Sequence, residues 1–341
     1  MIELLEDPEA PLPAGASYAL QPAWARMCRR AFGWELRRWR VVEDGASVGV
    51  FALAQVRSRL FGTRLFGLPH CDESPLALEP GALAGESRRR ALGGEILGLL
   101  DREGSASGAL YAELRGLEPL PGSGLRCETP YCRFVLDLAP DYSRLRAAFD
   151  TNIHKNLKKA ERTVSVQERR SYDEELHRIY LAQMRVFGSP PLPPAYFTGL
   201  LEGRLARLFT ATVEGKTAAF LFLVVHDGVW HADVNAGLPR WDAFFPKVRL
   251  FDETIHRARA EGARAYDFMR TRPNSGVWDH KRKWGGREVP IHYHWRVYRD
   301  GGNLDADPEQ ARYRLPRLLF RWMPEALARR LGPPLRAGLA K

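Results

Sequence analysis

Residues 264–286 read R-A-Y-D-F-M-R-T-R-P-N-S-G-V-W-D-H-K-R-K-W-G-G and are the most informative segment of the chain. It begins as a short apolar strand over 264–269 and continues directly into a turn crowded with cations. Seven basic residues and two acids fall between positions 264 and 287. A core strand that leads into such a charge excess predicts a site for an anionic ligand, and a merely solvated basic turn is the alternative.

The residues in front of this stretch predict a mixed sheet. Apolar runs and turn signals indicate strands over 205–213, 218–226 and 229–235, followed by a helix over 246–261. The succession of hairpin, strand, helix and strand fits a sheet with helices on both faces. Further upstream, the predicted elements of this half are the helices 142–161, 173–187 and 196–203.

The first half of the chain predicts the same order of elements. Its expected elements are a helix over 22–32, strands over 36–42 and 48–56, a helix over 85–103 and strands over 108–114 and 134–138. The expected fold class is therefore α/β, of the mixed α+β kind, with two tandem domains, each a mixed central sheet flanked by helices. We expect the domains at 1–140 and 141–300, followed by a basic tail at 301–341.

Length and composition agree with a two-domain soluble protein. The 341 residues exceed one ordinary domain, and 45% hydrophobic with 27% charged residues is typical of globular proteins. No run of about 18 apolar residues suggests a membrane span, and the acidic start M-I-E-L-L-E-D lacks the features of a secretory signal. Four scattered cysteines favour reduced thiols. We therefore expect a cytoplasmic location.

Residues 264–286 resemble the FemAB-like branch of the GNAT acyltransferase superfamily, including the type associated with exopolysaccharide and exosortase loci. The family has a D-F-G-R-S-like strand end, a Ser-Gly turn and an F-K-x-x-W-G-like motif; here Met269 stands where Gly is common, and His280 replaces the Phe. N-I-H-K-N-L-K-K-A-E-R at 152–162 and the segment 56–72 are also similar to family elements. The resemblance implies two tandem GNAT-like domains and transfer of an acyl or aminoacyl group to an amine.

Four residues are candidates for the chemistry. Lys281 matches the lysine of the family motif and is expected near an anionic phosphate or the developing oxyanion. On strand 229–235, alternation places His231, Asp233 and Asn235 on one face, where His231 or Asp233 would accept the amine proton. Asp267 is the other carboxylate candidate. The alternatives are a solvent-facing strand side and, for Asp267, an internal ion pair with a neighbouring arginine.

The remaining candidates are expected to bind substrate. Guanidinium and ammonium groups suit the phosphates of a nucleotide- or lipid-linked substrate, and a basic helix face suits a tRNA or a lipid diphosphate. The predicted substrate-binding residues are Arg270, Arg272, Lys283, Asn235, Asp72, Lys155 and Lys158. Asp72 matches an acidic loop position of the family, with a loop cap as the alternative, and the charged helix has a merely solvated face as its alternative.

No metal site is expected. His292 and His294 alternate along a strand over 289–297, but no third ligand is near them in the sequence. We expect no tightly bound cofactor; the co-substrate is an acyl-CoA or an aminoacyl-tRNA. The segment R-W-D-A-F-F-P-K-V-R-L at 240–250, where CoA-dependent domains carry a glycine-rich turn, has no glycine. That absence argues against CoA and leaves both donors open.

The tail at 311–341 has eight basic residues and one acid, with leucines and aromatics between them. It predicts one or two basic amphipathic helices broken by Pro316 and Pro324, suited to peripheral contact with the inner face of a membrane or to packing on the body.

The preferred function is an N-acyl- or aminoacyltransferase acting on an amine of a cell-envelope, polysaccharide or peptidoglycan precursor. We expect a monomer. A nucleic-acid-binding module and a non-catalytic scaffold in polysaccharide export are the alternatives.

Overall fold

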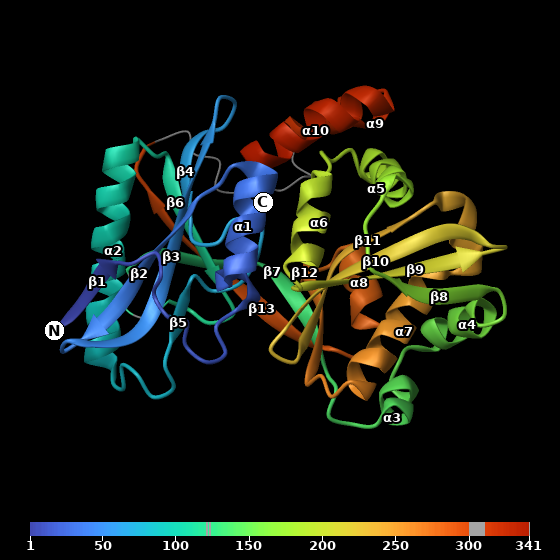
Figure 1. Cartoon of the computed structure of the whole chain (residues 1–341), viewed down its shortest axis with the longest axis horizontal. Helices are drawn as coiled ribbons and strands as arrows, with labels where there is room; N and C mark the ends of the chain where they lie inside the picture. Colours follow the sequence, from blue (N-terminus) through green and yellow to red (C-terminus); the bar gives the residue numbers. More distant parts are fainter. Residues whose placement is uncertain (121, 123, 300–310, 341) are drawn as a thin grey trace. The chain divides into compact units, whose positions relative to one another are not determined.

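The structure is a computed structural model that describes residues 1–120, 122, 124–299 and 311–340. The chain forms two compact units. Unit 1 comprises Met1–Tyr131, Pro290–Asp307 and Pro334–Lys341, and unit 2 comprises Cys132–Val289 and Pro308–Pro333. Figure 1 shows the elements of both units coloured along the sequence.

Unit 1 is built on a mixed sheet. Its strands are β1 (Ile2–Glu6), β2 (Leu36–Glu43), β3 (Ala46–Ser58), β4 (Gly62–Phe66), β5 (Leu76–Leu78), β6 (Tyr111–Gly116) and most of β13 (Arg287–Val297). The order is β1-β2-β3-β4-β6-β13, with β5 paired to β3. Among the described strands of this unit, only β4 and β6 run parallel; the other neighbours are antiparallel.

Helices complete unit 1. The short η1 (Tyr18–Leu20) leads into α1 (Pro22–Phe32), and α2 (Glu86–Ser107) packs against β1, β4 and β6. The helix expected over 85–103 is confirmed as α2, and its apolar face, formed by Leu92, Ile96, Leu99 and Leu100, is buried in the core. This burial holds α2 on the sheet.

The strands of unit 2 also pair in a mixed arrangement. They are the second half of β7 (Arg126–Asp137), β8 (Val164–Arg169), β9 (Ala206–Val213), β10 (Lys216–His226), β11 (Val229–Gly237) and β12 (Ala265–Thr271). The order is β7-β12-β11-β10-β9-β8. Among the described strands of this unit, only β11 and β12 run parallel; the other neighbours are antiparallel.

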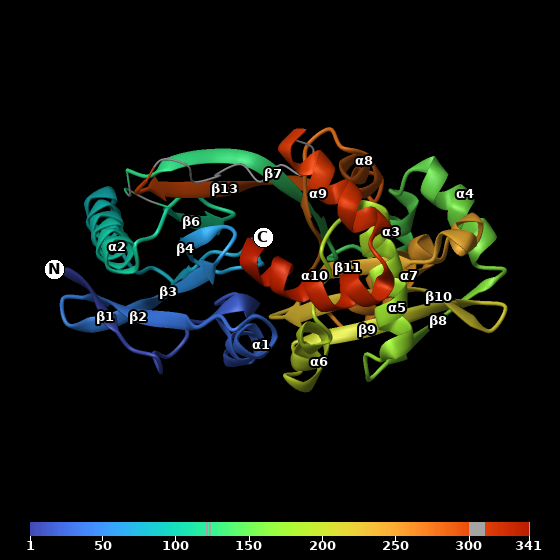
Figure 2. The same cartoon turned by 90° about the horizontal axis from the view of Figure 1, so that it is seen from above.

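Helices cover both faces of the unit 2 sheet, as predicted (Figure 2). They are α3 (Tyr142–Ala147), α4 (Thr151–Ala160), α5 (Glu174–Phe187), α6 (Pro194–Glu202), η2 (Pro239–Phe244), α7 (Pro246–Ala260) and α8 (Gly276–Arg282). Successive residues of β10 divide between the faces. Leu221 and Leu223 join the core that contains the buried side chains of α7, whereas Phe222 packs edge-on against Phe197 of α6.

Both units follow the same order of strand pairings, which confirms the expected mixed α/β architecture. In each unit, antiparallel strands lead to one parallel pair, and an antiparallel strand follows that pair. The strand that follows the pair is β13 in unit 1, from late in the chain, and β7 in unit 2, from the first half of the chain. The expected boundaries at 140 and 300 therefore differ from the observed division, because sequence order does not reveal which sheet a strand joins.

Two predicted elements need correction. The single helix expected over 142–161 is divided into α3 and α4, because the Asp150 carboxylate accepts a hydrogen bond from the Asn152 N–H at 2.8 Å and caps a new helix. The cationic turn after β12 is the helix α8, which begins where the Ser275 hydroxyl accepts from the Trp278 N–H at 3.1 Å. The strands β1, β5 and β8 were not expected.

The C-terminal segment forms α9 (Ala311–Trp322) and α10 (Glu325–Leu339). The predicted break at Pro324 is confirmed, but α9 continues through Pro316. Packing of α9 against α5 stabilises a helix that has lost one backbone hydrogen bond at the proline. Among the described residues, no helix combines the length and the apolar character needed to cross a lipid bilayer.

Candidate active site

The parallel strands of unit 2 separate after a short ladder. β11 and β12 pair over three positions, from Val229 with Ala265 to His231 with Asp267. β11 then continues to Gly237, and among the described strands only β10 accompanies it there. The edge of β11 over 232–237 therefore lacks β12 as a pairing partner, and its backbone N–H and C=O groups are candidates for binding a ligand. Open α/β sheets bind ligands at such carboxyl ends of parallel strands.

A β-bulge interrupts β11 beside this opening. Phe222 pairs with Val234, whereas the next residue of β10, Leu223, pairs with Ala232. Asp233 is therefore the extra residue. Bulges bend a strand and redirect its side chains, and they are frequent next to active sites.

The bulge overturns part of the predicted side-chain arrangement. Directly paired residues of antiparallel strands point to the same face. Asn235 pairs with Leu221, which lies in the core on the α7 side, whereas His231 pairs with Val224 on the opposite face. The prediction that His231, Asp233 and Asn235 share one face is therefore wrong for Asn235, because one extra residue reverses the alternation.

Three buried polar side chains meet where the parallel ladder ends. The Asp267 carboxylate accepts hydrogen bonds from Arg133 Nη1 at 2.7 Å and from the Met269 N–H at 2.8 Å. His231 Nδ1 lies 3.0 Å from the oxygen of Asp267 that Arg133 also contacts. All three side chains are nearly inaccessible to solvent, with exposures of 5%, 1% and 8% for Arg133, Asp267 and His231. The ion pair considered for Asp267 thus exists, but its partner is Arg133.

Asp267 remains a carboxylate in this environment. Burial alone would raise its pKa, but the charge of Arg133 and the hydrogen bonds from His231 and Met269 outweigh burial and hold the pKa at about 2. A charged carboxylate accepts the proton on His231 Nδ1. This hydrogen bond selects the tautomer in which Nε2 is the basic nitrogen. The arrangement of carboxylate, imidazole and orienting guanidinium is suited to general-base catalysis.

Asp233 and Asn235 occupy different environments beyond His231. The Tyr196 hydroxyl of α6 donates a hydrogen bond to Asp233 at 2.6 Å. Asn235 Oδ1 is a buried acceptor with no hydrogen-bond partner among the described residues. An unsatisfied buried amide oxygen costs about 1–3 kcal/mol, so a ligand that donates a hydrogen bond there would gain from it.

The structure uses Lys281 to join two backbone elements. Its ammonium donates to the carbonyl oxygens of Met269 and Arg270, both at 2.9 Å, and so ties α8 to the end of β12. Lys283, a predicted substrate-binding residue, directly follows α8 and forms an ion pair with Asp279 of that helix at 2.9 Å. Half-buried Arg270 and exposed Arg272 lie where β12 ends. The cation cluster is therefore partly structural.

The two departures from the family motif have local explanations. Met269 has a φ of 60°, a left-handed conformation that favours glycine, and it lies where the register between β12 and β7 shifts. His280 packs 6.1 Å from the ring of Phe251 and 6.3 Å from that of Trp284, in an aromatic environment that suits the usual Phe. Burial lowers the pKa of His280 to about 4, so its imidazole is neutral there.

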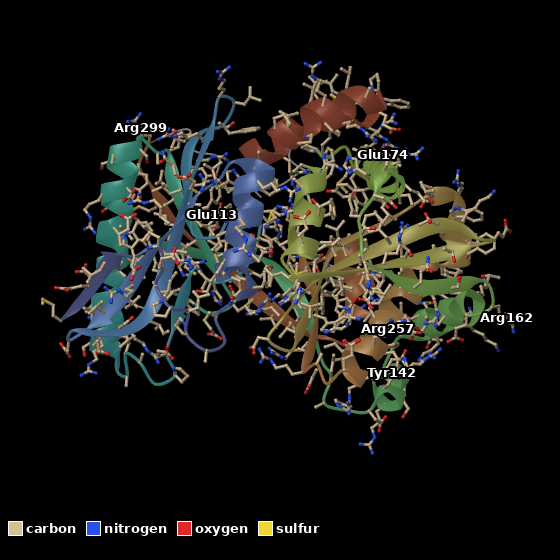
Figure 3. The ribbon with its side chains drawn as sticks, in the orientation of Figure 1. Glu113, Tyr142, Arg162, Glu174, Arg257 and Arg299 are labelled. Carbon is tan, nitrogen blue, oxygen red and sulfur yellow. The ribbon has the colours of Figure 1, made fainter. Side chains whose placement is uncertain are left out.

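Asp72 belongs to a buried charge cluster of unit 1. Its carboxylate accepts from Arg115 Nη1 at 3.2 Å and from the Tyr293 hydroxyl at 3.3 Å. Arg115 also pairs with Glu113 at 2.6 Å, and Glu113 accepts from Trp295 Nε1 at 3.2 Å. Figure 3 marks Glu113 on its strand. These contacts satisfy the Asp72 carboxylate within unit 1.

The other predicted residues lie apart from this cluster. Lys155 and Lys158 are exposed on α4. His294 is buried and its Nε2 accepts from the Leu120 N–H at 3.1 Å, and burial lowers its pKa to about 4. Within the described parts of the chain, no third ligand atom joins His292 and His294.

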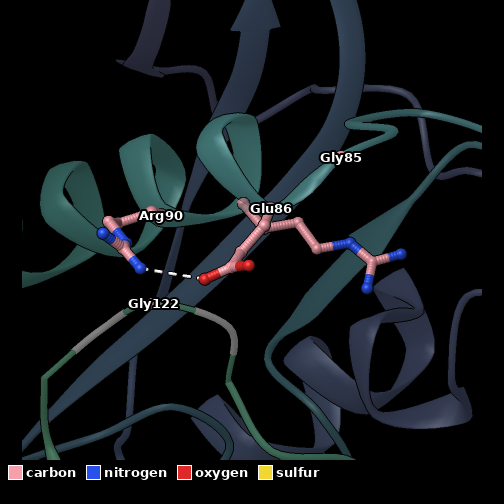
Figure 4. A pocket seen from close by; sticks show the side chains of 5 residues that line it. Gly85, Glu86, Arg90 and Gly122 are labelled. Carbon is pink, nitrogen blue, oxygen red and sulfur yellow. Dashed lines mark hydrogen bonds and ion pairs between the residues drawn. The ribbon is translucent and has the colours of Figure 1, made fainter.

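A cavity of about 510 Å³ opens at the start of α2 (Figure 4). It is lined by Gly85, Glu86, Arg89, Arg90 and Gly122. Its carboxylate, Glu86, forms an exposed ion pair with Arg90 at 2.9 Å, and none of the predicted site residues lines it. We assign it no role.

Sequence reasoning missed Arg133 and Tyr196. Arg133 directly precedes the predicted strand 134–138, and an arginine beside a buried apolar run requires a carboxylate partner. That requirement was a usable signal for Arg133, although it did not identify the partner. Tyr196 gave no comparable signal, because it reads as the first residue of a helix that follows a proline-rich turn.

Part of unit 2 matches a known acyltransferase family. Residues 145–282 match the family described as Acetyltransferase (GNAT) domain. The matched range contains His231 and Asp267, and Arg133 lies before it. Unit 2 therefore carries a GNAT acyltransferase domain, and the chain is an acyltransferase. A search of curated proteins finds no significant match.

Solved structures show the same fold across both units. The chain is similar to FemX, with 15% identity, a TM-score of 0.62, and coverage of 83% of this chain and 92% of that one. It is also similar to a tandem GNAT protein from the clavulanic acid biosynthesis pathway, with 12% identity, a TM-score of 0.50, and coverage of 87% and 98%. A Bacteroides thetaiotaomicron protein of unknown function is 10% identical, with a TM-score of 0.53 over 81% and 90%. The expected fold of two tandem domains, each with helices on a mixed sheet, is thereby confirmed.

Proposed function

We propose that this chain is an N-acyltransferase that moves an acyl group from an activated donor to an amine of a cell-envelope or polysaccharide precursor. The observation that carries the proposal is the buried contact between His231 and Asp267, oriented by Arg133, where the strands of the GNAT domain separate. An extended donor would lie along the open edge of β11. The carbonyl to be attacked would then lie near His231.

The reaction forms a C–N bond and breaks the bond between the acyl carbon and its leaving group. The amine nitrogen attacks the carbonyl carbon, and its proton passes to His231 Nε2. The thiolate or alkoxide that leaves then takes up a proton. The backbone N–H groups at the open edge of β11 would donate hydrogen bonds to the negatively charged oxygen that forms on the acyl carbon, as in an oxyanion hole.

Acyl-CoA is the first donor to test, because GNAT acyltransferases take it as co-substrate. The first turn of α7 has no side-chain cap, so its N–H groups suit an anionic phosphate. Phe245, just before that helix, adopts a left-handed φ of 57° without being glycine. The backbone therefore makes a sharp turn despite the missing glycine. Aminoacyl-tRNA is the second donor, supported by exposed Lys155 and Lys158 on α4.

The acceptor class follows from the FemAB-like sequence motif and from the cations near the end of β12. Arg270 and Arg272 are candidates for the phosphates of a nucleotide- or lipid-linked amine. Asn235 Oδ1 is a candidate acceptor for a substrate N–H or O–H. An exopolysaccharide or peptidoglycan precursor would combine an amine with such phosphates.

The test combines purified full-length protein with an acyl-CoA series or charged tRNA and with UDP-linked amino sugars, and detects products by mass spectrometry. His231→Asn is the decisive variant, because its side-chain amide keeps a donor toward Asp267 but removes the basic Nε2. We expect turnover to fall about 10²- to 10⁴-fold. His226→Asn, the same change at the half-buried end of β10, is the matched control and should retain turnover.

Unchanged turnover in folded His231→Asn would refute the assignment of the base. If no donor gives a product and the protein instead binds nucleic acid in a strongly salt-dependent manner, the chain acts as a binding module and the transferase proposal fails.

A further inference from the structure

The helix α9 exposes an apolar stripe. Leu315, Leu318, Leu319 and Trp322 recur at intervals of three and four residues, so they lie on one side of the helix. Their exposures are 64%, 53%, 61% and 75%. Large apolar side chains gathered in this way on a surface mark a site of interaction.

The stripe points away from unit 2 because other residues of the same segment hold it there. Phe320, on the opposite side of α9, is 95% buried, and α9 packs against α5. At the end of α5, Gly188 has a φ of 65°, and a Cβ at that position would lie 2.5 Å from the Arg317 carbonyl oxygen. This close approach requires glycine at the contact.

The following helix is anchored in a similar way. Arg329 of α10 pairs with Glu174 at the start of α5, at 2.9 Å for Nη1; Figure 3 marks Glu174. A Cβ on Gly332 would meet the ring of Pro191 at 2.3 Å, which shows how closely this helix approaches unit 2. Leu327 and Leu331, one helical turn apart, remain 47% and 44% exposed. Both helices thus present apolar side chains outward from fixed positions.

Positive charge accompanies the exposed apolar side chains. Residues 311–333 contain six arginines and a single acid, Glu325. Arg321 is exposed beside Trp322, and Arg330 is exposed beside Leu331. A second copy of this chain would bring a like-charged surface to the stripe, which disfavours self-association. An anionic surface with an apolar interior complements both features.

We propose that α9 and the first half of α10 form a docking surface for anionic lipid bilayers. Leu315, Leu318, Leu319 and Trp322 insert at the boundary between headgroups and acyl chains, and Arg321 and Arg330 contact the anionic headgroups. The surface would bring unit 2 to lipid-linked substrates. The proposal of membrane binding does not depend on the proposed acyl transfer.

The test is vesicle flotation of the full-length protein. Vesicles of phosphatidylcholine alone are compared with vesicles in which about one-third of the lipid is phosphatidylglycerol. We expect binding only to the anionic vesicles, and expect it to weaken as salt shortens the Debye length from about 10 Å at 0.1 M to about 3 Å at 1 M. Arg321→Gln with Arg330→Gln should weaken binding by about 25-fold, on the basis of about fivefold per arginine.

Leu318→Gln with Trp322→Gln should weaken flotation by at least about tenfold without unfolding the protein, because both side chains are already exposed. Arg59→Gln with Leu60→Gln, an exposed pair in unit 1, is the matched control and should float like the wild type. Equal flotation of the stripe variant and the wild type would overturn the proposal. So would absence of flotation together with a dimer that Trp322→Gln separates, since the stripe would then bind a second copy.

Discussion

The two units end their parallel ladders with different side chains. In unit 2 the last pair is His231 with Asp267, and in unit 1 it is Phe66 with Glu113. Each carboxylate is buried beside an arginine, Arg133 in unit 2 and Arg115 in unit 1. Among the described residues, an imidazole joins the ion pair of unit 2 and none joins that of unit 1. If His231 is the base, as proposed, the two ion pairs differ in role: one orients a base and the other holds a core together.

The strands around the two ladders differ in regularity. In unit 2, the register shifts between β10 and β11 and again between β12 and β7. In unit 1, the corresponding pairs β3 with β4 and β6 with β13 show no such shift. Bulges cost ladder hydrogen bonds and redirect side chains. Such shifts flank the His231 ladder on both sides, whereas the shift in unit 1 lies between β2 and β3, away from its parallel ladder. If the proposed site is correct, the irregular strands of unit 2 are those that shape it.

Neutralising Asp267 and Glu113 one at a time tests most directly whether the two units differ in this way. Asp267→Asn should lower turnover about 10³-fold, because His231 loses the charge that orients it. Glu113→Gln should leave turnover within about twofold but lower the free energy of unfolding by about 3 kcal/mol, because Arg115 loses a buried partner. Steady-state kinetics and urea unfolding measure the two effects. An equal loss of turnover in both variants would remove the distinction between the units.

Because Asp267 is charged in the folded protein, the free energy of unfolding of the wild type should depend more strongly on acid pH than that of Asp267→Asn. The folded pKa of Asp267, about 2, lies below the ordinary value for aspartate. A depressed pKa stabilises the folded state above the unfolded pKa of about 4, and this contribution is lost as the pH falls toward 2. The stability advantage of wild type over Asp267→Asn should therefore shrink by about 2 kcal/mol between pH 5 and pH 2.

Urea unfolding at a series of pH values measures this difference, since the other carboxylates are common to both proteins. A constant advantage across the range would show that Asp267 does not carry its charge in the folded state.

The smallest expected effect concerns the bulge in β12. Met269→Gly should raise the free energy of unfolding by about 0.5–1 kcal/mol, because a left-handed conformation is strained for methionine and not for glycine. Ala265→Gly, at a regular position of the same strand, should lower it by about the same amount. Thermal and urea unfolding measure both changes. If Met269→Gly is as destabilising as Ala265→Gly, the backbone at Met269 is not strained. Strain would then not be a difference between β12 and β6, the corresponding strand of unit 1.

Sequence patterns predicted most of unit 2 and only part of its site. The alternation of apolar residues identified β9 to β12 and α7, because burial imposes a period on every buried element. The same alternation assigned the Asn235 side chain to the wrong face of β11, because a bulge adds one residue to the strand without a sequence signal. Lys281 was expected to face an anion. Its ammonium instead donates to the carbonyl oxygens of Met269 and Arg270, at the irregular end of β12. Local patterns do not encode such irregular backbone.

Local sequence patterns account for most of the succession of strands and helices, for the basic character of the chain and for the likeness of residues 264–286 to acyltransferases. The contacts of Arg133 and of His231 with Asp267 became visible only in the folded chain. These three residues are far apart along the chain and lie on three adjacent strands. Sheet order and register brought them together, and both depend on long-range pairing that no local stretch of residues specifies.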